Sequence, residues 1–391
     1  MAYAIDVSKG QNIGTVSAQW AARSADQRFT SLSELHAQVL EWAEQSRVEI
    51  IKPAQIVAKF DVSRPDYLAL AVGDNVQTDG THWAFEQVCR AAGTPPNYMR
   101  SIPGPLAAVN LNYGLKAAEQ KEIAAYVRKP KIGDDLLRGL TSPRYGRICD
   151  HEVVKGVMNV AGNGTGDTRW KVPGTINWSS QFGVTYNPEV NITKQNTTLY
   201  ASDRDVFLFL VDDKNPIEVG KLANGDPDLM FRGFYVWNSE VGAKTYGFAS
   251  MYLRGVCQNR NLWGVEQFRE LTFKHTSGAP DRFAAEASQA LLDFADLGQV
   301  KLIAGVKAAK AAIVAKTDED AIDWLDRYGF SAQASKSILE TSLKEEQTAA
   351  RSVWDFAQAV SAIARGEEFQ EDRLRLERIA GKMLDKVKVT A

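Results

Sequence analysis

The chain has 391 residues, of which 45% are hydrophobic and 24% charged, and its 46 Lys and Arg nearly balance its 48 Asp and Glu. This length predicts two or three domains with a large core, and the hydrophobic fraction excludes wholesale disorder. The net charge of −2 excludes a uniformly basic coat for nucleic acid but allows a local basic face. All 13 prolines lie before residue 281, so a change of structure is expected there.

The N-terminal sequence and the cysteines predict a protein of the reducing cytoplasm. Met1–Gly10 lacks a charged segment followed by an apolar stretch. The longest apolar run, Val206–Val211, is far shorter than the roughly 20 residues that cross a bilayer. The three cysteines are scattered, as are the four histidines, so we expect reduced thiols, no membrane contact, no metal and no cofactor. Cys149 precedes His151 closely, but a buried thiol beside a surface histidine is favoured over a nucleophile.

The sequence pattern of residues 1–135 predicts a region that contains both helices and strands. Apolar spacing over residues 32–43 predicts a helix that Ser31 or Ser33 starts, and residues 67–72 read as a strand. Thr81 is a suitable N-cap for a helix that ends at Gly93, after which Pro95 and Pro96 begin another. This outline is a helix–turn–helix. The second helix begins with Pro-Asn-Tyr-Met rather than basic residues, which favours packing over DNA reading.

Residues 136–280 predict a β-rich core. Apolar and aromatic residues alternate within Trp170–Tyr186 and Phe231–Trp237, and Lys244–Leu253 adds aromatic and small residues. Val206–Val211 is apolar throughout, as expected of a strand covered on both faces. The glycine-rich segment Gly162–Asp167 fits no phosphate-binding motif.

Residues 281–391 predict an all-helical region, because they lack proline and repeat apolar residues at spacings of three and four. The predicted fold class is therefore α+β. An antiparallel β-rich central region is flanked by an α/β N-terminal region and an all-helical C-terminal region.

The most basic window, residues 128–147, is the candidate nucleic-acid site. Tyr145 lies between two arginines, and arginine with an interleaved aromatic suits phosphate contact and base stacking. The alternative is a solvated loop whose basic residues offset nearby acids. The candidate residues are Arg128, Lys129, Lys131, Arg138, Arg144, Tyr145 and Arg147.

A second candidate group consists of Asn238, Ser239, Arg254 and Asn259 at the ends of predicted strands. Their amides and guanidinium could present hydrogen bonds to a ligand. Equally, the amides and hydroxyl could close turns, and Arg254 could be a buried tether.

Paired carboxylates could bind magnesium, as in a nuclease, although most paired aspartates are turn residues. The pairs are Asp134 with Asp135, Asp203 with Asp205, and Asp212 with Asp213. No fixed pattern surrounds them, and no hydrolase or kinase motif is present. We therefore predict no specific catalytic residues.

Four blocks of the sequence match the pattern of a known family: Leu140–Tyr145, Val236–Gly242, Leu253–Asn259 and Val353–Ser361. On these blocks the chain resembles the phage/plasmid-like protein family, a domain of unknown function carried by bacteriophages, plasmids and integrative elements. They follow the family's order along most of the chain and also include its N-terminal outline from Thr81. Glu240 and Val241 stand where the family has His-Asp, and Arg260 where it often has glycine or threonine.

The resemblance implies a protein of a mobile element in a bacterial host, with no known reaction. Together with the basic window, it leads to the hypothesis of a non-enzymatic, homo-oligomeric protein that binds DNA, in single-stranded or recombining form. One alternative is an interaction protein that inhibits a host defence or restriction factor. Another is a metal-dependent nuclease.

Overall fold

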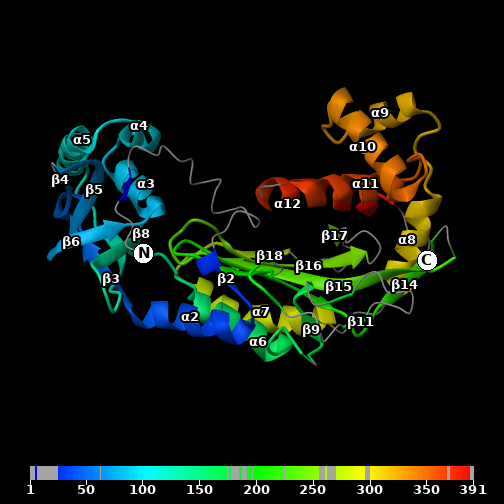
Figure 1. Ribbon diagram of the computed structural model, residues 1–391, viewed down its shortest axis with the longest axis horizontal. Coiled ribbons are helices and arrows are strands. Elements are labelled where there is room, and N and C mark those ends of the chain that lie inside the picture. The colour runs from blue at the N-terminus through cyan, green and yellow to red at the C-terminus, as the bar shows by residue number, and fades with distance from the viewer. Residues whose placement is uncertain are drawn as a thin grey trace.

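The computed structural model describes residues 5–6, 25–61, 63–166, 168–173, 176–177, 185–186, 192–195, 197–222, 225–254, 260–261, 270–295, 300–367 and 370–387. These residues form two separate large sheets and a group of C-terminal helices (Figure 1). The α+β class predicted from the sequence is confirmed. No described helix is long and apolar enough to cross a membrane.

The first sheet runs in the order β1-β5-β6-β8-β7-β3, with β4 paired to β5. Its pairs are antiparallel except β6 with β8, which are parallel and so require a crossover. The predicted boundary at residue 135 falls at the first residue of β8. The strands are β1 (Ile5–Asp6), β3 (Ser46–Ile51), β4 (Ile56–Asp61), β5 (Arg64–Val72), β6 (Asn75–Gly80), β7 (Ile123–Arg128) and β8 (Asp135–Thr141).

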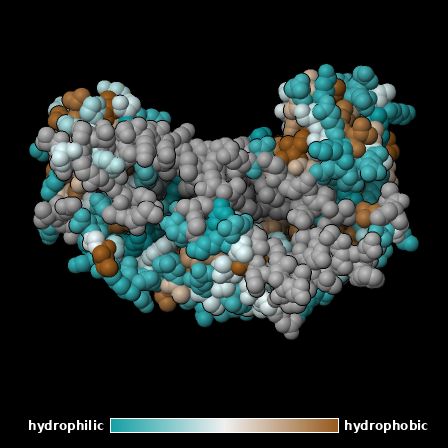
Figure 2. All heavy atoms as spheres, viewed as in Figure 1, coloured by the Kyte–Doolittle hydropathy of each residue, from teal (hydrophilic) through white to brown (hydrophobic). Residues whose placement is uncertain are grey.

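The crossover contains helices α3 (His82–Ala91), α4 (Pro96–Ser101) and α5 (Gly104–Ala117). As predicted, the Thr81 side chain caps α3 by accepting a hydrogen bond from the Ala84 N–H. In α4, Met99 and Arg100 are buried, so this helix packs against its neighbours. The outward face of α5 is apolar, and Figure 2 shows hydrophobic atoms at this end of the molecule. Exposed large apolar residues here are Tyr98, Leu106, Val109 and Tyr113.

Helix α5 also closes the free edge of β4. The Asn112 side chain donates to the Ala58 carbonyl at 2.9 Å and accepts from the Ala58 N–H at 2.8 Å. Ala58 lies opposite Leu70 of β5, and the hydrogen bonds from its own backbone point away from that strand. The Asn112 amide thus satisfies both the N–H and the carbonyl of Ala58 on the side that faces away from β5.

The second sheet runs β17-β16-β15-β13-β12-β2, with β14 on β15, β18 on β16 and β9 on β13. All its pairs are antiparallel. Every residue of β13 is buried, which confirms a strand covered on both faces. The strands are β2 (Arg28–Phe29), β9 (Trp170–Lys171), β12 (Leu199–Ala201), β13 (Val206–Asp212), β14 (Ile217–Lys221), β15 (Pro227–Asn238), β16 (Tyr246–Arg254), β17 (Arg260–Asn261) and β18 (Glu270–Phe273); β10 (Ile176–Asn177) and β11 (Thr185–Tyr186) form a separate pair.

Three helices, α2 (Leu32–Glu44), α6 (Asp150–Ala161) and α7 (Ala279–Ala295), lie along one side of the second sheet (Figure 1). Helix α2 begins as predicted, because the Ser31 hydroxyl accepts from the Glu34 N–H. Although α2 comes early in the chain, its buried face belongs to the core of the second sheet. Short 3₁₀ turns lie at Ala25–Gln27 and Pro53–Gln55.

The remaining helices gather at the opposite end of the molecule from the first sheet (Figure 1). Their buried residues join those of the second sheet in a single apolar cluster. Thr317, Ser331 and Ser352 cap three of them by accepting hydrogen bonds from backbone N–H groups. The helices are α8 (Val300–Ala311), α9 (Asp318–Asp326), α10 (Ala332–Glu346), α11 (Val353–Gly366) and α12 (Gln370–Asp385).

We predict that Phe234→Ala lowers the free energy of unfolding by about 3–5 kcal/mol, the usual cost of deleting a buried aromatic ring. Phe234 is fully buried, with its ring centroid 4.9 Å from Trp170 and 5.8 Å from Phe248. Urea unfolding followed by circular dichroism measures the change. The control Leu343→Ala removes a side chain that is 59% exposed and should cost no more than about 0.5 kcal/mol. Equal losses of unfolding free energy in Phe234→Ala and Leu343→Ala would contradict the buried position of Phe234.

Candidate functional site

The segment Asn238–Gly242 leaves the end of β15 and packs against the first sheet. Its central feature is an ion pair between Arg138 of β8 and Glu240, with 2.7 Å between Nη1 and Oε2. Both side chains are nearly fully buried, at 1% and 2% exposed. Burial opposes the charge of Arg138, but the Glu240 carboxylate outweighs it and raises the Arg138 pKa.

Glu240 collects further hydrogen bonds from both parts of the molecule. Its Oε1 accepts from the backbone N–H of Asp150, at the start of α6, at 3.0 Å. Its Oε2 accepts from the Tyr126 hydroxyl of β7 at 3.4 Å. The Glu240 carbonyl accepts from Arg147 at 2.8 Å. One glutamate therefore links the two sheets and the first turn of α6.

Val241 completes the junction through its backbone. Its carbonyl accepts from the indole N–H of Trp83 at 2.9 Å and from Gln87 at 3.1 Å. Gln87 in turn accepts from the Leu140 N–H at 2.7 Å. A Cβ atom on Gly139 would lie only 2.9 Å from the Val241 Cβ, so glycine at this position permits the close approach.

Asn238 and Ser239, predicted as ligand-binding or turn-closing residues, make internal hydrogen bonds. The Asn238 amide nitrogen donates to the Ile148 carbonyl and to Asp150 Oδ1, both at 2.8 Å. The Ser239 hydroxyl donates to the Arg204 carbonyl at 2.8 Å. Both side chains are fully buried, and these hydrogen bonds join the segment to parts of the chain that are distant in sequence.

Arg254 lies at the far end of β16, in a different cluster. It makes a bidentate pair with Asp228, at 2.7 and 3.1 Å, and a third bond to Glu346 of α10 at 2.5 Å. Arg254 is 3% exposed and tethers the second sheet to the C-terminal helices. Asn259 lies outside the described residues.

The residues of the basic window have unlike surroundings. Arg138 and Arg147 face the Glu240 junction. The Arg147 guanidinium lies 4.0 Å from the Tyr126 ring centre. Because Arg138 is buried and paired with Glu240, it is not placed to contact a phosphate. Arg128 lies 5.2 Å from the ring centre of Trp42, and the exposed Lys131 pairs with Glu41 at 2.7 Å. Lys129 and Arg144 are exposed.

Tyr145 marks a surface at which three segments meet. Its ring stacks on His275 with 4.8 Å between centroids, and its hydroxyl donates to the Ser239 carbonyl at 2.9 Å. The Gly146 N–H bonds the His275 carbonyl, and His275 Nδ1 lies 3.0 Å from the Gly146 carbonyl. Burial lowers the pKa of His275, which favours the neutral ring.

We call residues 142–147, 242–245 and 274–278 the three-loop surface. These loops contain no Asp or Glu, and their basic residues include Arg144, Lys244 and Lys274. Arg144 and Lys274 are exposed, and Lys244 is half-buried. Sequence reasoning found Arg144 and Tyr145 but missed Lys244, Lys274 and His275, because they come from distant segments. The only local signal was the absence of acidic residues in each short segment.

Most aspartates of the pairs proposed for magnesium are engaged by protein groups, and Asp135 pairs with Arg47 at 2.6 Å. Asp212 pairs with Arg169 at 2.7 Å, and Asp213 pairs with Lys171. Asp205 accepts from Ser202 at 2.8 Å, and burial raises the Asp203 pKa. Within the described part of the chain, no three His, Cys, Asp or Glu side chains converge as metal ligands.

The Cys149 thiol is not activated for nucleophilic attack. Burial, and then the negative charge of Glu240, raises its pKa to about 12. A thiol with such a pKa stays protonated near neutral pH. This agrees with the favoured expectation that Cys149 and His151 do not form a catalytic pair.

We predict that Glu240→Gln lowers the free energy of unfolding by about 3 kcal/mol, because it leaves the buried Arg138 charge without its counter-ion. Urea unfolding at neutral pH measures the loss. In the control Asp318→Asn, the disrupted pair with Arg351 is largely exposed, and the cost should stay below about 1 kcal/mol. The double variant R138M/E240L should recover most of the stability. Equal losses of unfolding free energy in Glu240→Gln and Asp318→Asn would contradict a buried ion pair at the junction.

A pH dependence is expected from Asp150. Burial, and then repulsion by Glu240, raises its pKa well above the usual value, so the folded state holds the proton more tightly than the unfolded state. The stabilising contribution is present at low pH and is lost as pH rises through the raised pKa. Asp150→Asn should therefore become more stable than the unchanged protein as pH rises from 4 to 8. A constant difference in urea unfolding across these pH values would contradict this.

Comparison with known proteins identifies no relatives: no family model, no curated protein and no solved structure matches the chain. The resemblance to the phage/plasmid-like family therefore stays a prediction. The candidate roles of these residues depend on geometry and chemistry alone.

Proposed function

We propose that the protein binds nucleic acid, with a preference for single strands, through the three-loop surface. The supporting observation is the convergence of three basic loops without carboxylates around the Tyr145–His275 stack. A cationic surface attracts the phosphate backbone, and aromatic side chains provide a platform for unpaired bases. We include in this proposal the mobile-element origin and self-association expected from the sequence.

The same surface is held in a fixed position by the Glu240 junction. The Tyr145 hydroxyl bonds the carbonyl of Ser239, the residue before Glu240, and Arg147 bonds the Glu240 carbonyl. A Cβ on Gly146 would lie 1.7 Å from the Thr276 carbonyl oxygen, so the first and third loops approach at backbone distance. Such a platform loses little conformational entropy when a ligand binds.

The proposal predicts salt-dependent binding of a labelled single-stranded oligonucleotide, measured by fluorescence anisotropy. Each phosphate contact adds about 0.7 to the slope of log affinity against log salt for single strands. Replacing Arg144 and Lys274 together by alanine should lower the magnitude of this slope by about 1.4. The control replaces Lys336 and Lys382, two exposed lysines of α10 and α12, and removes the same charge elsewhere.

Equal slopes for the two double variants would place binding away from the three-loop surface. Absence of salt-sensitive binding by the unchanged protein would overturn the proposal. A complex with a host protein that survives nuclease treatment would then favour the interaction alternative. Cleavage of the oligonucleotide only when magnesium is added would instead favour the nuclease alternative.

A further inference from the structure

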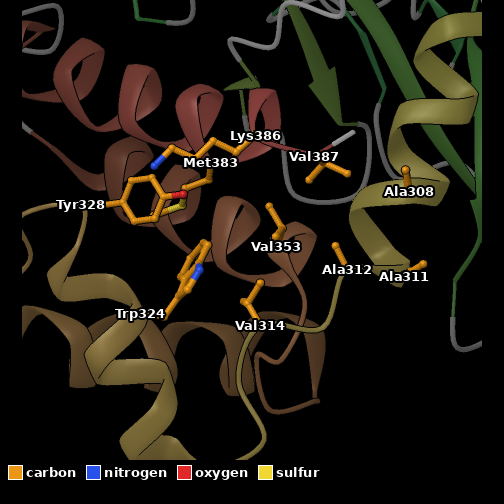
Figure 3. A pocket seen from close by; sticks show the side chains of 10 residues that line it. All are labelled: Ala308, Ala311, Ala312, Val314, Trp324, Tyr328, Val353, Met383, Lys386 and Val387. Atoms are coloured by element: carbon orange, nitrogen blue, oxygen red, sulfur yellow. The ribbon is translucent and has the colours of Figure 1, made fainter. Parts of the chain in front are cut away.

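The C-terminal helices line an open pocket of about 500 Å³, remote in sequence from the three-loop surface. Its walls come from α8, α9, α11 and α12 and from the segments that follow α8, α9 and α12 (Figure 3). The volume lies within the range of about 300–1,000 Å³ that is typical of small-molecule sites. The pocket is therefore large enough for a ligand with one or two rings.

The pocket has a polar side and an apolar side. Figure 3 shows Trp324, Tyr328 and Lys386 on one side and the alanines of α8 on the other. The apolar wall includes Ala308 and Ala312, whose small side chains leave the space open. Among the described residues that line the pocket there is no Asp or Glu, so none of them offsets the charge of Lys386.

The polar groups on this wall can all donate hydrogen bonds. The Lys386 ammonium lies 4.5 Å from the centre of the Tyr328 ring. Among the described residues, neither the Trp324 indole N–H nor the Tyr328 hydroxyl has a hydrogen-bond partner. An indole N–H can only donate, and an ammonium cannot accept. The chemistry of this wall therefore selects an acceptor that carries negative charge.

The aromatic wall is formed before any ligand arrives. Trp324 is only 9% exposed, and its ring centroid lies 4.9 Å from Phe356 and 4.8 Å from Tyr328. Met383 beside it is fully buried. A rigid aromatic surface favours a flat ring over a flexible chain, because offset or tilted ring pairs gain from their quadrupoles.

We propose that this pocket binds a small aromatic carboxylate. The carboxylate accepts hydrogen bonds from the Lys386 ammonium and from the Trp324 or Tyr328 donor, and the ring lies against Trp324 and the alanines of α8. This site does not depend on the proposed nucleic-acid function. It adds a small-molecule ligand to a region that the three-loop surface does not use.

The test compares three naphthalene probes of equal size by isothermal titration calorimetry: 2-naphthoate, 2-naphthamide and 2-naphthylmethylammonium. We expect 2-naphthoate to bind at least about ten-fold more tightly than the amide, because a charge-assisted hydrogen bond contributes more to affinity than a neutral one. The cation should bind most weakly. Lys386→Gln should abolish the preference for the anion.

Lys382→Gln is the matched control, because Lys382 lies one turn earlier on α12, is exposed and does not line the pocket. It should leave all three affinities unchanged. Ala308→Phe should block every probe while circular dichroism shows unchanged helix content. If Ala308→Phe unfolds the helices, the comparison of K386Q with K382Q decides alone. No binding of 2-naphthoate, equal binding of all probes, or equal effects of K386Q and K382Q would overturn the proposal.

Discussion

The buried ion pair between Arg138 and Glu240 determines how the two sheets are joined. Isolated charges in a protein interior are costly, and they persist only where a counter-ion and further hydrogen bonds compensate their desolvation. Here Asp150, Tyr126 and Arg138 all bond the Glu240 carboxylate. Because these partners belong to α6, β7 and β8, the carboxylate can be satisfied only when the two sheets are assembled in this orientation.

This junction also connects the interior to the candidate ligand surface. Tyr145 and Arg147 follow β8 directly, and each bonds a backbone carbonyl of Ser239 or Glu240. The loop that holds them is thus fixed by the same segment that supplies the buried glutamate. A second ionic cluster, in which Asp228 meets Arg254 and Lys310, joins the C-terminal helices to the opposite end of the second sheet. A buried ionic cluster thus lies at each of these two junctions.

Periodicity and local chemistry predicted much of the fold. The strand Val206–Val211, the capped helices after Ser31 and Thr81, and the proline-free helical region follow from patterns that neighbouring residues define. The assignment of α2 to the second core depends on distant packing, which no local pattern reveals.

The candidate site was less predictable for the same reason. The basic window was visible as charge, but its Arg138 pairs with a residue 102 positions away. Net charge along a segment does not distinguish an arginine that pairs internally from one that faces solvent. Likewise, the segments of Lys274 and Arg144 come together through the Tyr145–His275 stack and the contact of His275 with Gly146, 129 positions away.

The amide of Asn112 has a consequence for how copies of this chain can meet. A sheet edge with unpaired N–H and C=O groups recruits strands from other molecules, and natural proteins block such edges. On β4, one asparagine from α5 imitates the donor and acceptor of a neighbouring strand at Ala58. Growth of the first sheet by strand addition is thereby hindered at β4, beside Ala58.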